Sequence, residues 1–149
     1  MREMMFRAYV QPTRWDDLTL PKLQRKIIPI SSIDFVAKTC GKNYADEYDL
    51  ADVELMQYTG LKDNDGLEIF EGDIVVIDMW QGNEHGYIAE DGIIAWHQES
   101  SAFKWFSGEL SDGNNYWLTQ ADELQRKVIG NIYENPELLK AGESASLDV

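Results

Sequence analysis

The chain of 149 residues contains one cysteine, two histidines and no long hydrophobic run. Because Cys40 is alone, no disulfide can form within the chain, as is typical of a reducing cytoplasm. We expect Cys40 to be a small loop or strand-end residue, with a reactive thiol as the alternative. No apolar run approaches the ~18 residues that a membrane span requires. The first residues lack the apolar stretch and cleavage site of a secretory signal, so we expect a soluble, cytoplasmic protein.

Patterns that carry catalysis or bind metals are also scarce. His85 and His97 stand far apart, and without further cysteines or an HExxH spacing they give little reason to expect zinc. Neither GxSxG nor a Cys/His signature is present. Glu71 and Asp73 could form an acid and base pair, but the start of a strand is normally wet, so we interpret them as turn residues. We therefore expect no catalytic residue, no metal site, no cofactor and no enzymatic activity.

Basic residues are few after the first third of the chain. The whole sequence has 13 basic and 27 acidic residues, a net charge of −14. Residues 1–45 have 8 basic and 4 acidic groups (+4), whereas residues 46–149 have 5 and 23 (−18). An acidic body repels phosphate, so direct nucleic-acid binding is disfavoured. We expect the basic segment to pack on the acidic body of its own chain or of a neighbour. The alternative is an acidic surface that imitates DNA and blocks a basic partner.

The most informative stretch is MQYTGLKDNDGLEIFEGDIVVI, residues 56–77, in which turn residues separate three strand-like runs. We expect Gly60 to end the first strand. Asp63–Gly66 is typical of a reverse turn, because the aspartate accepts backbone hydrogen bonds and the glycine adopts a positive φ. The turn Glu71–Asp73 leads into Ile74–Ile77, an apolar run that predicts a central strand covered on both faces. This stretch favours a small β-barrel.

The turn at Asp63–Gly66 also resembles part of a calcium-binding loop, but its register is wrong. An EF-hand loop has acidic or amide residues at positions 1, 3 and 5, glycine at 6 and glutamate at 12. With Gly66 at position 6, Leu61 falls at position 1 and Ile77 at position 12. A turn is therefore the better interpretation.

Short apolar and aromatic runs elsewhere predict further strands, joined by turns rich in Ser, Gly, Asp and Asn. The segment that begins at Lys22 fits both a helix and a strand, and we interpret its last part as a strand. Residues 41–52 are expected to form a mobile polar loop with a helical turn at 45–50. The additional strands are expected at residues 6–10, 32–37, 53–59, 93–97, 102–106, 116–118 and 128–133, and the last of these would close the barrel.

Two short helical turns are expected near the C-terminus. Thr119 can cap a turn over residues 121–124, whose acidic side chains suit the positive end of the helix dipole. Asn135 and Pro136 begin a second turn that runs to Lys140. The small and polar residues 142–149 predict a flexible tail.

Aromatic residues are plentiful in the strand at 102–106. Strand alternation places Phe103 and Trp105 on one face, and Lys104 and Phe106 on the other. These aromatic residues could form the core or one aromatic patch. A platform for stacking bases also needs a cationic groove, and Lys104 is the only basic residue in the middle of the chain. The core is therefore the better interpretation.

Tryptophans are the residues most suited to contact a partner. Trp80 falls in a predicted exposed hairpin tip, residues 80–86, where it would either cover the end of the barrel or anchor a partner. The others belong to the predicted aromatic strands. The candidate partner contacts are Trp80, Trp96, Trp105 and Trp117.

Three blocks of the sequence resemble the YopX family of small proteins encoded by phages and prophages, mostly of Gram-positive bacteria. The blocks are MREMMFRAY at the N-terminus, MQYTGLKDNDGLEIFEGDIVVI in the centre and VIGNIYENPELL near the C-terminus, in the family's order. Residues 11–52 and 79–127 match no pattern. The resemblance implies a mostly β fold around an SH3-like barrel, a phage or prophage origin, and a function that is not established for the family. It implies no catalytic or ligand residue.

We therefore predict a mainly β protein with a small, SH3-like, partly open β-barrel, additional N-terminal β elements and short helices. One domain is expected over residues 1–141, with a variable N-terminal part at 1–52, a barrel core at 53–141 and the tail at 142–149. The expected function is that of a non-enzymatic phage accessory protein, an interaction module for a protein partner or for itself as a homo-oligomer. The alternatives are an acidic DNA mimic that inhibits a host nucleic-acid-binding protein, and a small-ligand-binding protein or enzyme.

Overall fold

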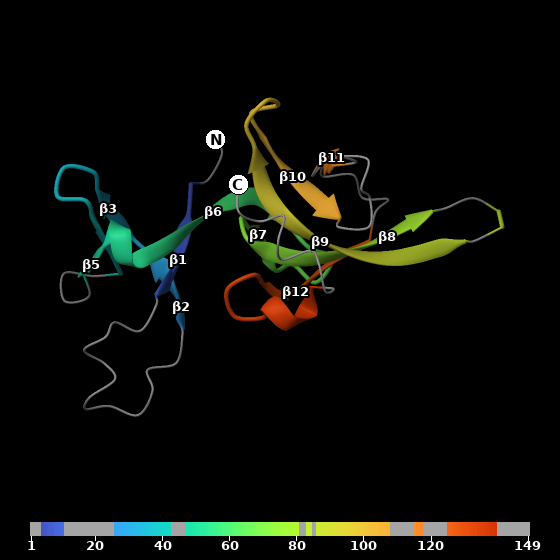
Figure 1. Cartoon of the computed structure of the whole chain (residues 1–149), viewed down its shortest axis with the longest axis horizontal. Coiled ribbons are helices and arrows are strands. Elements are labelled where there is room, and N and C mark those ends of the chain that lie inside the picture. The colour runs from blue at the N-terminus through green and yellow to red at the C-terminus, as the bar shows by residue number, and fades with distance from the viewer. Residues whose placement is uncertain are drawn as a thin grey trace. The chain divides into compact units, whose positions relative to one another are not determined.

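The structure is a computed structural model that describes residues 4–10, 26–42, 47–80, 83–84, 86–107, 115–117 and 125–139 (Figure 1). In these ranges the regular structure is almost entirely β, which confirms a mainly β protein. The helical elements there are two 3-10 turns, η2 (Leu50–Asp52) and η3 (Pro136–Leu138). In the described part of the chain, no helix is both long enough and apolar enough to cross a membrane.

The chain divides into two compact units, residues 1–58 and 59–149. The boundary falls inside a strand, β6 (Val53–Lys62), which belongs to both units. The boundary predicted from the sequence lies a few residues earlier, at the start of that strand. A single domain over residues 1–141 stays a prediction.

Three strands form the main sheet of the first unit. The strand β1 (Phe6–Val10), predicted from the sequence, lies between β2 (Lys26–Ile30) and the first part of β6, antiparallel to both. The ambiguous segment is thus a strand over residues 26–30. Pro29, which has no N–H to donate to a ladder, is tolerated because β2 is an edge strand.

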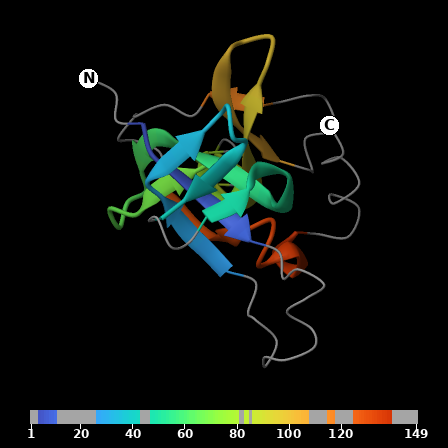
Figure 2. The same cartoon turned by 90° about the vertical axis from the view of Figure 1, so that its left-hand side faces the viewer.

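A small second sheet completes the first unit, with the order β3 (Ser32–Asp34), β4 (Thr39–Gly41) and β5 (Glu47–Asp49). Figure 2 faces this unit and shows these short strands in cyan and green. The core of the unit consists of Ala8, Ile28, Cys40 and Val53, with Ile33, Tyr48 and other half-buried residues packed against it.

Two predictions in this sheet are wrong. The strand expected over residues 32–37 ends at Asp34, because Asp34 Oδ1 accepts hydrogen bonds from the backbone N–H groups of Val36 (2.9 Å) and Ala37 (2.8 Å) and turns the chain. The helical turn expected at residues 45–50 lies later, at Leu50–Asp52, where the Asp49 side chain caps it. Residues 47–49 pair with β4 and are a strand instead.

Gly60 does not end its strand, which is a further correction. Its φ is +88°, a value that glycine adopts without steric cost, yet β6 continues to Lys62 and pairs with β7 (Glu68–Phe70). The Thr59 hydroxyl bridges the irregularity: it donates to the Ile69 oxygen (2.7 Å) and accepts from the Leu61 N–H (3.2 Å). The Thr59 side chain therefore supplies one hydrogen bond between the two strands and one within β6.

The second unit contains a five-stranded antiparallel sheet in the order β11-β10-β9-β8-β12. The strand β8 is an inner strand next to the middle strand β9, and its apolar run Ile74–Ile77 is covered on both faces, as predicted. The strand β9 begins at Tyr87, six residues before the predicted start, because it pairs with β8 along the full length of a long hairpin (Figure 1). The strands are β8 (Asp73–Trp80), β9 (Tyr87–His97), β10 (Ala102–Ser107), β11 (Asn115–Trp117) and β12 (Arg126–Asn131).

The sheets are not closed into a barrel. The strand predicted to close it, β12, pairs with β8 and forms one edge of the sheet, while β11 forms the other. One core cluster consists of Val75, Ile77, Ile94, Phe103 and Trp105 of this sheet together with Ile69 of β7. Phe103 and Trp105 were predicted to lie on one face of the strand. Their register, opposite Trp96 and Ile94, confirms this.

The C-terminal helical turn is the short element η3, and next to it Leu139 packs with Ile74 and Ile93 on the other face of the sheet. The helical turn predicted at residues 121–124 and the tail predicted at 142–149 lie outside the described residues.

Candidate interaction surfaces

The buried carboxylate of Asp63 organises the predicted turn. Its Oδ1 accepts hydrogen bonds from the N–H groups of Asp65 (2.9 Å) and Leu67 (2.8 Å), and its Oδ2 accepts one from the Val128 N–H (3.1 Å). Gly66 has the predicted positive φ of +84°. Since both oxygens bind backbone N–H groups, the carboxylate serves the fold and not a cation. Among the described residues, no three His, Cys, Asp or Glu side chains are arranged to hold a metal ion.

The same turn covers the outer edge of β12. Asn64 forms two hydrogen bonds with the backbone of Arg126, one through its N–H (3.1 Å to the oxygen) and one through its side-chain Oδ1. The Arg126 Nε donates to the Lys62 oxygen (3.2 Å). An exposed sheet edge can pair with another chain, and this contact satisfies part of the edge of β12 internally.

Asp73 defines the next turn, as predicted, but it is not in water. The side chain is fully buried, and its Oδ2 accepts a hydrogen bond from the Phe70 N–H (2.8 Å). Gly72 (φ +84°) donates its N–H to the Ile94 oxygen (2.7 Å) and accepts from the Ile132 N–H (2.9 Å). The prediction of a wet turn is wrong because β9 and the C-terminal block close over it.

The C-terminal block is organised in the same way by two asparagines. Asn131 Oδ1 accepts hydrogen bonds from the N–H groups of Tyr133 (3.1 Å) and Glu134 (2.8 Å). Asn135 Oδ1 accepts a hydrogen bond from the Asn131 N–H (3.3 Å). The same oxygen lies 2.6 Å from the position that a Cβ on Gly130 would occupy. The polar residues of the central and C-terminal blocks thus hold backbone in place.

His97 and Ser100 form a pair of a possible base and nucleophile that was not predicted from the sequence. His97 Nδ1 lies 2.8 Å from Ser100 Oγ and accepts a hydrogen bond from the Ser100 N–H (3.2 Å). A hydrolytic dyad needs a third group to orient the histidine and donors for an oxyanion. Among the described residues, His97 has no carboxylate partner; the ring of Phe106 lies near it (6.1 Å between centroids). The pair is better explained as the hydrogen bonding of a tight turn between β9 and β10.

The four tryptophans do not form one patch. Trp105 is 0% exposed, and its Nε1 donates to the Val75 oxygen (2.8 Å), so it is a core residue and not a partner contact. Trp96 lies on the same face of the sheet but is 46% exposed, with its ring edge-on to Phe103 (5.1 Å). Trp80 ends β8 and Trp117 ends β11, and their side chains lie outside the described part. Trp96 is therefore the tryptophan that the described surface presents.

Among the residues that the structure describes, the most exposed large apolar side chains lie elsewhere, in the turn between β3 and β4. Phe35 is 78% exposed and Val36 is 95% exposed. They were not predicted, because the apolar residues at 32–37 favour a strand. The available signal was Asp34, whose side chain favours a turn over the two following residues.

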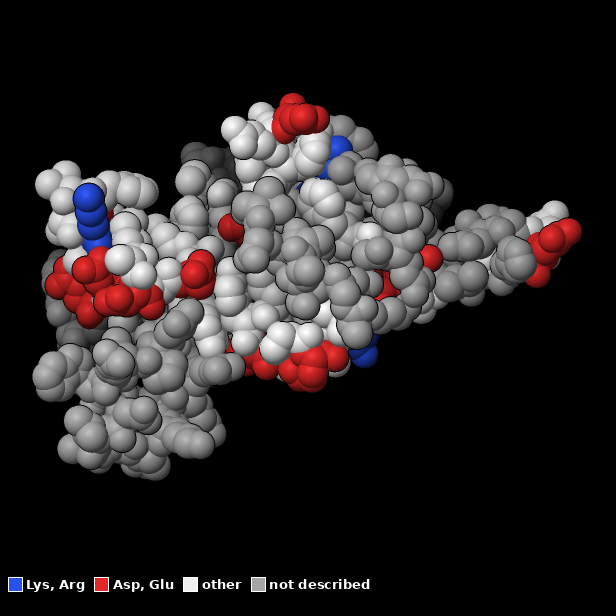
Figure 3. Space-filling view, in the orientation of Figure 1, with Lys and Arg blue, Asp and Glu red and all other residues white. Residues whose placement is uncertain are grey.

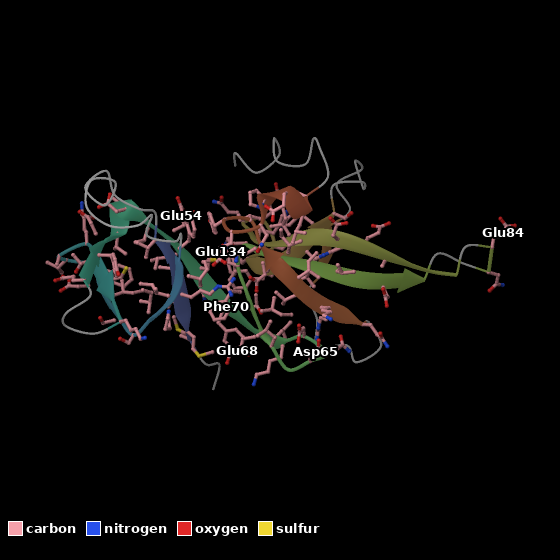
Figure 4. The ribbon with its side chains drawn as sticks, turned by 90° about the horizontal axis from the view of Figure 1, so that it is seen from below. Glu54, Asp65, Glu68, Phe70, Glu84 and Glu134 are labelled. Carbon is pink, nitrogen blue, oxygen red and sulfur yellow. The ribbon has the colours of Figure 1, made fainter. Side chains whose placement is uncertain are left out.

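Acidic side chains of the second unit are scattered. Figure 4 shows Glu84 at the far end of the long β8/β9 hairpin, well away from Asp65 beside the β6/β7 turn. On the face in Figure 3, the acidic residues of this unit form small separate groups. A DNA mimic needs carboxylates in two rows at the phosphate spacing, and on the face in Figure 3 the second unit does not show such rows.

Comparisons with known proteins agree with this fold. The family model described as YopX protein matches residues 5–140. A crystal structure of protein EF1440 from Enterococcus faecalis is similar, with a TM-score of 0.59 and 24% sequence identity, over 94% of this chain and 100% of that chain. At this identity the likeness concerns the fold alone. No curated protein matches the chain.

Proposed function

The chain belongs to the YopX family, and from this premise we propose that it is a non-enzymatic protein-interaction module of a phage or prophage that acts in the cytoplasm of the bacterial host. It binds a protein partner through exposed apolar side chains held on a rigid β scaffold. Polar residues of the central and C-terminal blocks, which resemble the YopX family, stabilise that scaffold by hydrogen bonds to its backbone.

One observation carries this proposal: several polar side chains of the central and C-terminal blocks are bonded to the backbone, whereas two apolar rings are exposed. The side-chain oxygens of Asp63, Asp73 and Asn131 accept backbone hydrogen bonds. A general acid or base must instead reach a substrate. Trp96 and Phe35 are exposed, and covering such rings with a partner surface is favourable. This arrangement suits binding better than catalysis.

We also propose that the second unit is a partly open, SH3-like barrel. In this arrangement the β6/β7 turn stands beside β12 and joins it through side chains. The hydrogen bonds that the side-chain oxygens of Asp63 and Asn64 accept from β12 support the proposal.

The partner is a host protein or a second copy of the chain. Self-association would bring the +4 segment of one chain onto the −18 segment of another, an electrostatic contact that salt weakens. Light scattering at low and high salt tests it. A mass equal to that of the monomer under both conditions would show that the chain does not self-associate.

An affinity pull-down tests the module directly. The full chain is used as bait in the bacterium that carries its gene, and Trp96→Ala, Trp80→Ala and the neighbouring surface change Gln98→Ala are compared with the wild type. We expect mass spectrometry to show one protein enriched by the wild type and by Gln98→Ala, and depleted with at least one tryptophan variant. Equal recovery with every bait, including an unrelated acidic protein, would contradict the proposal.

A further inference from the structure

Building on the interaction-module proposal, we propose that the β3/β4 turn and the outer face of the sheet β3-β4-β5 form one binding surface. Its partner is a protein that presents an apolar pocket surrounded by lysine or arginine side chains. We call this the hairpin-tip surface; it comprises Asp34, Phe35, Val36, Glu47, Asp49 and Asp52.

The strand register places three of the acidic residues on one face. The row Ile33, Cys40 and Tyr48 is directed to the core of the unit. Because successive residues of a strand alternate between faces, the neighbouring rows point outward. These rows are Ser32, Gly41 and Glu47, and Asp34, Thr39 and Asp49.

The apolar turn stands at the same end of this face as Asp34 and Asp49. It follows Asp34 and precedes Thr39, which pairs with Asp49. The 3-10 turn with Asp52 also starts here, since the Leu50 N–H donates to the Lys38 oxygen (2.9 Å). Phe35 and Val36 therefore stand beside carboxylates that are contributed by two other segments.

The turn is held in one conformation. Asp34 Oδ1 binds the N–H groups of Val36 and Ala37, and the Lys38 oxygen is tied to η2. Lys38 has a φ of +58°, which is costly for a residue with a side chain and persists only where the surroundings enforce it. An anchor that is already ordered loses little entropy on binding. The tip is thus preorganised with its two apolar side chains in water.

Charge selects the kind of partner. The described residues from Ser32 to Glu54 expose five carboxylates (Asp34, Glu47, Asp49, Asp52, Glu54) and two lysines (Lys38, Lys42). Figure 3 shows a dense group of acidic side chains on this unit. An acidic rim around an apolar anchor is complementary to a basic rim around an apolar pocket. An anionic membrane surface, or the same face of a second copy, would be repelled.

The test uses the full chain with a photocrosslinking phenylalanine analogue at position 35, expressed in the bacterium that carries its gene. The analogue at position 96 serves as a second site. A protein crosslinked from position 35 is then purified, and calorimetry measures its affinity for the wild-type chain and for three variants. These are the tip variant Phe35→Ser/Val36→Ser, the charge variant Glu47→Gln/Asp49→Asn, and Leu67→Ser. Leu67 is a matched control because it is an exposed apolar residue in a turn of the other unit.

We expect the tip variant to weaken binding at least about tenfold and Leu67→Ser to change it less than about twofold. The charge variant should weaken binding and reduce its salt dependence. Circular dichroism checks that the variants fold. Unchanged affinity of the tip variant, affinity independent of salt, or crosslinks to lipid or to a second copy would overturn the inference. Crosslinks from position 96 alone would overturn it while leaving the interaction module intact, and the absence of crosslinks at both positions would contradict both proposals.

Discussion

The indole Nε1 of Trp105 donates a hydrogen bond to the backbone oxygen of Val75 at 2.8 Å. This bond joins β10 to β8 across the intervening strand β9. The indole can reach across because β9 has a glycine in its path: a Cβ on Gly92 would lie 2.4 Å from the ring and 2.6 Å from the Phe106 oxygen. The packing of the core therefore requires a residue without a side chain at position 92.

We predict that Gly92→Ala lowers the free energy of unfolding by about 1–3 kcal/mol, the usual cost of overpacking a core. The indole must shift, and the Phe106 oxygen is backbone that cannot turn aside. Urea unfolding followed by circular dichroism measures the effect. In a Trp105→Phe background the cost should be smaller by more than ~0.5 kcal/mol, because part of the clash is gone. Additive effects would show that the ring and the glycine are not coupled.

Asp63→Asn should destabilise the protein by about 1–3 kcal/mol. An amide has one oxygen, so it cannot accept from the Val128 N–H and also from the Asp65 and Leu67 N–H groups. Asp65→Asn is the matched control. Asp65 contacts Lys127 at 3.9 Å with both side chains exposed, so its loss should cost less than ~1 kcal/mol. Equal losses for the two variants, measured by chemical unfolding, would contradict the structural role of Asp63.

Cys40 should react slowly with a thiol reagent in the folded protein. Burial raises the pKa of the Cys40 thiol above its ordinary value, because the thiolate would lose its hydration. Because the pKa of the thiol is higher in the folded state, this group stabilises the fold fully at pH values below the unfolded-state thiol pKa, about 8.5. That stabilisation is lost as the pH rises through the folded-state pKa. The wild type should therefore lose stability relative to Cys40→Ala under alkaline conditions. A reaction rate at pH 8 equal to that of the denatured chain would refute this.

The two compact units should unfold together, as the single-domain prediction requires. β6 is continuous through the boundary, pairing with β1 in the first unit and with β7 in the second, so loss of one sheet removes partners from a strand of the other. Cys40 accessibility reports on the first unit and tryptophan fluorescence in a Trp15→Phe variant reports on the second. The two urea midpoints are expected to coincide. Separate midpoints would show two domains.

The sequence determined the features that depend on neighbouring residues alone. The turn at Asp63–Gly66 and the positive φ of Gly66 are confirmed, because an aspartate bonds to the backbone that follows it and glycine accepts φ values that other residues resist. The strand β1 was predicted from a short run of strand-like residues, and the shared face of Phe103 and Trp105 follows from alternation. The family resemblance was likewise carried by such local blocks.

Tertiary structure decided where strands ended, what they paired with and which side chains reached water. β12 pairs with β8 at the edge of the sheet, where the β6/β7 turn covers part of its outer side, although its sequence would equally suit a strand that closes a barrel. Trp96 and Trp105 share one face, yet only Trp105 is covered, because burial depends on what lies over each position and not on alternation. Phe35 is exposed because the turn at Asp34 and the pairing of β3 with β4 carry it to the end of a sheet. Pairing and coverage join residues distant in the chain, so no local pattern could specify them.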